Sequence, residues 1–149
     1  MMKRTHLAIG LAFALLFLPH VNDKISFFLI AVSSSLIPDI DSPTSYLGRH
    51  KIFRPLQWLS RHRGIFHSFT ICVALSIVFS FYIPVLALPF FLGYSSHLVA
   101  DSFTLEGITP FWPWAKTSEG VIRTGSRLEK PVFIAFLIVD AIFFLRLFV

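Results

Sequence analysis

The chain has 149 residues, of which 55% are hydrophobic and 14% are charged, and it carries a formal net charge of +5. Its mean hydropathy of +0.74 lies outside the range of ordinary soluble domains and predicts an integral membrane protein. The length suits one domain over residues 1–149, and a single cysteine, Cys72, excludes an intrachain disulfide.

Five apolar segments predict an all-α, polytopic membrane helix bundle with about five transmembrane helices. They cover residues 5–21, 24–38, 68–83, 84–100 and 131–149. The first has the basic start of a secretory signal but no small-residue cleavage pattern, so we expect a mature helix. The second is short, which leaves a tilted or partial insertion open. The third and fourth are divided at Pro84, because proline is tolerated at a helix start.

The basic residues predict the orientation of this bundle. With five crossings and the N-terminus inside, all thirteen basic residues except Lys24 and Arg146 fall on one face. The positive-inside rule assigns that face to the cytoplasm. We therefore expect a multi-pass protein of a bacterial or archaeal-type cytoplasmic (inner) membrane, with the N-terminus and the polar segments on the cytoplasmic side.

Metal-type ligands gather where the apolar segments end, on the predicted cytoplasmic face. A charge there is costly unless it is paired, hydrated or bound to a metal. His97 and Asp101 are four positions apart, so they share one helix face and could share a cation or simply pair with each other. Asp39 and Asp41 follow Pro38 and repel each other unless a cation or proton intervenes, although an ordinary turn would also use them.

Histidines complete the set. His62 and His67 lie on either side of Gly64, whose backbone freedom would allow a bend that turns both rings inward. Neutral imidazole is the commonest metal ligand, and the alternative is a pair of interfacial histidines beside lipid headgroups. His6 begins the first helix on the same face, either as a further ligand or as a polar helix start.

Together these residues predict a site for one or two divalent cations. Zinc is the leading candidate, with manganese or iron as alternatives, because mixed imidazole and carboxylate ligation suits all three. The predicted metal ligands are His6, Asp39, Asp41, His62, His67, His97 and Asp101.

The motifs themselves point to a family. They comprise His6, Pro38-Asp39-Ile40-Asp41, an HRGxxHS pattern over residues 62–68 and an SHLxxDxxTxxG pattern over residues 96–107. This succession resembles the YdjM-type family of inner-membrane metal-dependent hydrolases over most of the chain. The resemblance implies a multi-helix membrane protein with a hydrolase site and carries metal binding onto the residues above. The pattern is more remotely similar to zinc-dependent phospholipase C and P1-type nucleases.

We therefore predict a membrane-bound metal-dependent hydrolase that cleaves a phosphoester with metal-activated water. Asp41 is the candidate for assisting proton removal. Arg63 could bind the phosphate, or could serve only as a positive-inside anchor. Aromatic and basic residues at the membrane face favour a lipid or lipid-linked phosphate as substrate, whereas the charge excess is explained by topology and predicts no nucleic-acid partner.

Two non-enzymatic classes remain as alternatives. A metal-ion transporter would distribute its histidines and aspartates across the bilayer, whereas here they gather near one face. A structural or regulatory metal-binding membrane protein needs ligands but no open coordination position, and the number of candidate ligands argues against it.

Overall fold

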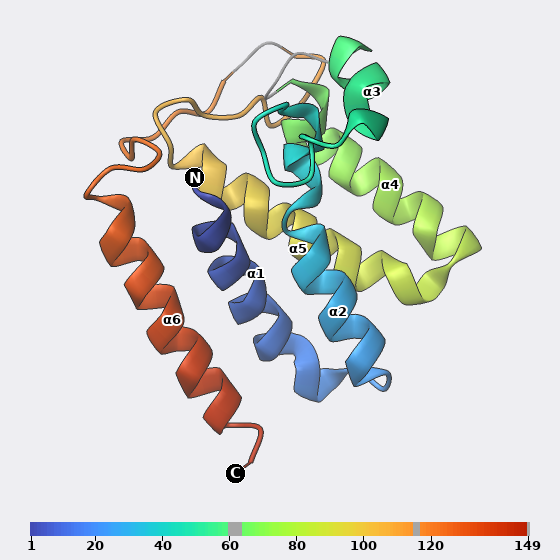
Figure 1. Cartoon of the computed structure of the whole chain (residues 1–149). Coiled ribbons are helices and arrows are strands. Elements are labelled where there is room, and N and C mark those ends of the chain that lie inside the picture. The colour runs from blue at the N-terminus through green and yellow to red at the C-terminus, as the bar shows by residue number, and fades with distance from the viewer. Residues whose placement is uncertain (60–63, 115–116, 149) are drawn as a thin grey trace.

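The computed structural model describes residues 1–59, 64–114 and 117–148, and this part of the chain is helical (Figure 1). Its α-helices are α1 (Lys3–Phe17), α2 (Lys24–Ser34), α3 (Arg54–Leu59), α4 (Phe69–Tyr82), α5 (Pro84–Ser102) and α6 (Glu129–Leu145). Short 3₁₀ helices are η1 (Leu18–His20), η2 (Ile37–Asp41), η3 (Lys51–Phe53) and η4 (Ile65–His67). The predicted all-α class is confirmed, with only isolated β-bridges within the described residues.

Helix α5 is the centre of the bundle. It contacts α1, α2 and α4, whereas α6 packs mainly against α1 at the side of the molecule (Figure 1). Gly93 allows the close approach of α5 to α2, because a Cβ atom at this position would lie 2.0 Å from the carbonyl oxygen of Ala31. The start of α1, the C-terminal end of α5 and the segment between α2 and α4 lie at the same end of the bundle (Figure 1).

The five apolar segments form α1, α2, α4, α5 and α6, and the division of the third from the fourth segment at Pro84 is confirmed. Helices α1 and α2 end several residues before their segments do, because 3₁₀ turns that contain Pro19 and Pro38 follow them. Asp23 and Ser68 begin α2 and α4 by accepting hydrogen bonds from backbone amides three residues later.

None of the helices in the described ranges has both the length and the unbroken apolar character that a membrane crossing needs. The predicted transmembrane crossings thus gain no support from the helix lengths.

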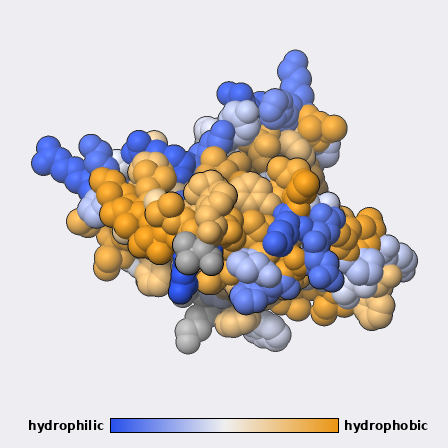
Figure 2. Space-filling model, turned by 90° about the horizontal axis from the view of Figure 1, so that it is seen from below, coloured by the Kyte–Doolittle hydropathy of each residue, from blue (hydrophilic) through white to orange (hydrophobic). Residues whose placement is uncertain are grey.

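Large apolar side chains are nevertheless exposed along the bundle. Figure 2, a view from below, shows hydrophobic residues over much of that face. Ile25 at the start of α2 and Phe81 at the end of α4 are 75% and 79% exposed. Exposure on this scale exceeds the scattered apolar residues of a typical soluble monomer.

Candidate metal centre

Imidazoles and carboxylates from four elements converge at the end of the bundle where α1 begins. His67 and His97 are fully buried, and His6 and Asp101 are each 1% exposed. Asp39 is the partly exposed member, with 22% of its side chain accessible. The converging residues are His6 of α1, Asp39 and Asp41 of η2, His67 of η4, and His97 and Asp101 of α5.

The core of the cluster is a triangle of donor atoms. Nε2 of His67 lies 3.4 Å from Nε2 of His97, and both nitrogens lie 3.7 Å from Oδ2 of Asp101. A point equidistant from three atoms at these separations lies about 2.1 Å from each, which matches zinc–nitrogen and zinc–oxygen bonds of roughly 2.0–2.2 Å. The triangle therefore fits a divalent cation.

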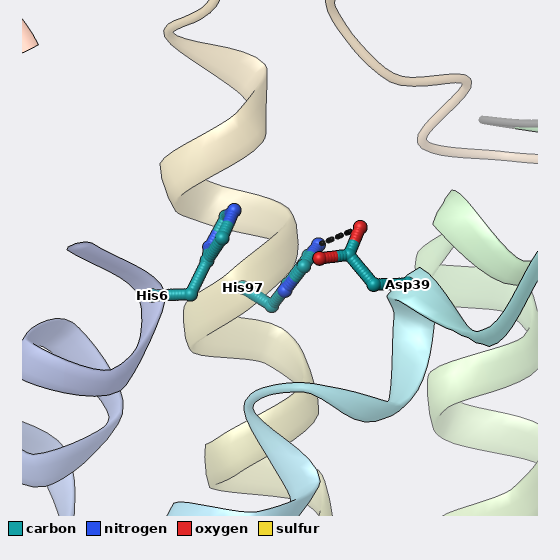
Figure 3. Close-up of side chains that lie close together, drawn as sticks. All are labelled: His6, Asp39 and His97. Atoms are coloured by element: carbon teal, nitrogen blue, oxygen red, sulfur yellow. Dashed lines mark ion pairs between the residues drawn. The ribbon is translucent and has the colours of Figure 1, made fainter. Parts of the chain in front are cut away.

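Asp39 supplies a further donor on the accessible side of the triangle. Its Oδ1 lies 3.7 Å from Nε2 of both His67 and His97. In Figure 3 the Asp39 carboxylate and the His97 ring point toward each other, with the His6 ring beside them. The ligand atoms of His6, Asp39 and His97 form a second triplet within 4.8 Å of one another.

His6 stacks on His97 with ring centroids 3.7 Å apart. Its Nε2 lies 3.2 Å from Oδ1 of Asp101, but neither ring nitrogen makes an aligned hydrogen bond to any described residue. A buried polar group without such a bond is costly, and a cation would remove that cost. Asp101 turns Oδ1 to His6 and to the Met1 amino group, which donates to it, and turns Oδ2 to His67 and His97.

Hydrogen bonds on the far side of each ring fix its orientation. Nδ1 of His97 donates to the carbonyl oxygen of Ser35 at 2.8 Å, and Nδ1 of His67 faces Oδ2 of Asp41 at 3.2 Å. Tyr94 donates to the carbonyl oxygen of Phe66 and so holds η4 in place. A proton on Nδ1 places the lone pair of each ring on Nε2, the nitrogen that faces the donor triangle, which is the usual arrangement around zinc-bound histidines.

Carboxylates around His67 also shift its titration. Burial alone would lower the pKa of His67, but hydrogen bonds to Asp39 and Asp41 raise it to about 9. Burial would raise the pKa of Asp39, and the hydrogen bond to His67, with the other nearby imidazoles, lowers it instead. Without a metal the cluster therefore keeps a proton on His67 at neutral pH, which a cation would have to displace.

A polar cavity of about 530 Å³ opens beside Asp39. Its wall includes Met1 and Lys3 from the start of the chain, Tyr46 from the loop after η2, and Glu106. The ammonium group of Lys3 lies 3.2 Å from the centroid of the Tyr46 ring, a cation–π contact. A small molecule in this chamber would lie against Asp39, the accessible member of the cluster.

Most of the predicted ligands come together as expected, and their role as ligands stays a prediction. Asp41 faces Nδ1 of His67, on the side of the ring away from the donor triangle, and so orients the ring. This position supports direct metal ligation or proton transfer by Asp41 less well than the sequence motif suggested. His62 and Arg63 lie outside the described residues. The part played by the Ser35 carbonyl could not be predicted, because it is a backbone group. Tyr94 could have been noticed, because it lies three positions before His97 on the same helix face.

The described part of the chain is thus a helical protein with exposed apolar side chains and a buried His–Asp cluster that could hold a metal ion. More particularly, the chain belongs to the YdjM inner membrane protein family, whose model matches residues 1–149. This confirms the resemblance inferred from the motifs and the inner-membrane assignment. The family description names no activity.

Curated relatives agree with this placement. The chain is 35% identical over 117 residues to the inner membrane protein YdjM of Escherichia coli (strain K12) and, equally, to that of Shigella flexneri. The matched region covers 67% of this chain and 57% of each relative, so the chain spans little more than half their length. No solved structure matches the chain.

Proposed function

We propose that this protein is a membrane-bound, metal-dependent hydrolase that cleaves a phosphoester in a lipid or lipid-linked substrate. The observation that carries the proposal is the donor triangle of His67, His97 and Asp101, which lies next to a polar cavity. Two imidazoles and one carboxylate are a ligand set of catalytic zinc sites, which keep a position open for water or substrate. Partly exposed Asp39, on the cavity wall, marks the open side.

One or two bound cations, zinc foremost and manganese or iron as alternatives, would supply activated water and neutralise charge on the phosphoryl oxygens. The chain's own residues hold the site in shape. Asp41 and the Ser35 carbonyl orient His67 and His97, respectively, through their Nδ1 atoms. Asp39, as the carboxylate nearest the cavity, is the better candidate to accept the proton that the attacking water loses. Arg63 would bind the phosphate group of the substrate.

The proposed setting is a multi-pass insertion in the inner membrane with the site on the cytoplasmic side. Family membership supports the membrane, and the exposed apolar side chains of α2 and α4 support contact with lipid. The basic residues support the orientation, because they concentrate in the segments around the candidate centre. A substrate whose head reaches the cytoplasmic surface while its tail remains in lipid suits this setting.

The test begins with metal content and continues with phosphate release from a panel of lipid phosphates and phosphodiesters. His97→Ala should lower metal affinity by more than about a hundredfold, beyond the loss expected for a residue that only orients a ligand, and should abolish hydrolysis. His20→Ala is the matched control, because His20 is exposed in η1. It should retain both metal and activity.

Other results would point elsewhere. Equal cleavage by the metal-free protein would refute the mechanism. Stoichiometric metal without hydrolysis of any panel member would indicate a structural or regulatory metal site. Metal flux into sealed vesicles without hydrolysis would indicate a transporter.

A further inference from the structure

An apolar groove of about 400 Å³ lies between α1, α5 and α6, apart from the polar cavity described above. The described residues that line it have apolar side chains, among them Ile9 of α1, Val99 of α5, Phe103 directly after α5, and Phe136 of α6. Val99 and Phe103 are 43% and 58% exposed, so the groove is accessible from the helix surface.

The groove and the polar cavity share one wall residue, Met1, whose amino group donates to Oδ1 of Asp101 in the candidate metal centre. Ala100 lines the groove and directly precedes Asp101 in α5, while Asp39 lines the cavity. Both chambers therefore border residues that belong to the donor cluster or lie next to it.

The lining of the polar chamber carries charges of both signs. The carboxylates of Asp39 and Glu106 and the ammonium group of Lys3 all line it, and Lys3 also contacts the Tyr46 ring. A phosphate head would be repelled by the two carboxylates and drawn toward Lys3 and toward a cation held by the donor cluster. The described lining of the groove has apolar side chains, which suits hydrocarbon.

From this arrangement we infer that the substrate is an amphiphilic phosphate, with its head in the cavity beside Lys3 and one hydrocarbon chain in the groove at Val99 and Phe136. The inference rests on the proposed hydrolase function and adds the two binding positions. Lipid is as apolar as the groove, so the groove contributes mainly position and not transfer free energy. It directs the scissile bond toward the donor cluster, as substrate-positioning contacts do in enzymes generally.

Filling the groove tests the inference. Val99→Trp places a large ring in the groove, and Val78→Trp is the matched control, because Val78 lies on α4 with a similar exposed fraction of 47%. The probes are two monoalkyl phosphates, dodecyl phosphate and butyl phosphate, presented to the metal-loaded protein in detergent. Bound metal is measured in each variant.

Val99→Trp should lower kcat/KM for dodecyl phosphate by about tenfold or more and leave that for butyl phosphate within about twofold. Val78→Trp should change neither value. A second readout, displacement of a spin-labelled alkyl phosphonate, measures binding without turnover, because a phosphonate has no ester bond to cleave at that position, and should show the same dependence on chain length.

The two proposals fail in different ways. Hydrolysis of both probes with equal sensitivity to Val99→Trp and Val78→Trp would overturn the groove while the hydrolase proposal stands. Chain-length-dependent binding that Val99→Trp removes, without hydrolysis of these probes or of any member of the panel of lipid phosphates and phosphodiesters, would support the groove and refute the hydrolase. Absence of chain-length dependence in both readouts would overturn the groove whatever the activity.

Discussion

Replacing Asp41 by asparagine should weaken metal binding without removing a ligand of the donor triangle. The Asp41 carboxylate faces Nδ1 of His67 at 3.2 Å, and both side chains are fully buried. Asparagine keeps an oxygen in a similar position but lacks the negative charge that makes the His67 ring a stronger metal ligand. Outer partners of this kind contribute ten- to a hundredfold to metal affinity, which corresponds to about 1.4–2.8 kcal/mol.

The assay is a competitive zinc titration against a chelator, with circular dichroism to confirm the helical fold. Asp23→Asn serves as the control, because Asp23 is an exposed helix cap and asparagine caps a helix equally well. Affinity within twofold of the parent for Asp41→Asn would refute the argument that Asp41 positions His67. A much larger loss, with one fewer oxygen ligand by X-ray absorption, would show that Asp41 binds the metal directly.

Three further outcomes are expected. Zinc affinity should rise as pH increases toward about 9, because binding must displace the proton that the neighbouring carboxylates keep on His67; a pH-independent affinity between pH 7 and 8.5 would contradict this. In the metal-free protein, the stability that comes from the raised pKa of His67 is complete below about pH 6.5 and is lost as the pH rises through about 9. The Tm of the metal-free protein should therefore fall over that pH range, and added zinc should raise it again. Gly93→Ala should lower the free energy of unfolding by about 1–3 kcal/mol, because its Cβ would clash with the backbone of α2; an unchanged denaturation midpoint would refute the close packing.

The helical architecture could be predicted from hydropathy, and the limits of that prediction have physical causes. Runs of apolar residues locate the five main helices, and Pro84 marks the division of α4 from α5. Hydropathy does not report that the chain turns into 3₁₀ geometry at Pro19 and Pro38 while the residues remain apolar. Hydropathy alone therefore placed the ends of α1 and α2 too late in the chain.

Much of the candidate centre was also accessible from sequence, because histidine and aspartate are conspicuous at the ends of apolar segments. The i, i+4 spacing of His97 and Asp101 places both side chains on one face of α5, as the structure has them. Distances between segments were not accessible. The position of Asp41 behind His67 depends on how η2 meets η4, and the hydrogen bond from His97 to the Ser35 carbonyl depends on how α2 packs against α5.

The donor triangle joins parts of the chain that are remote in sequence, since its two histidines are 30 positions apart and His97 reaches back 62 positions to Ser35. A cation at this place would act as a cross-link, closing loops whose entropy the unfolded chain would otherwise keep. Metal supply would then govern how long the protein survives proteolysis in the cell as well as whether it is active.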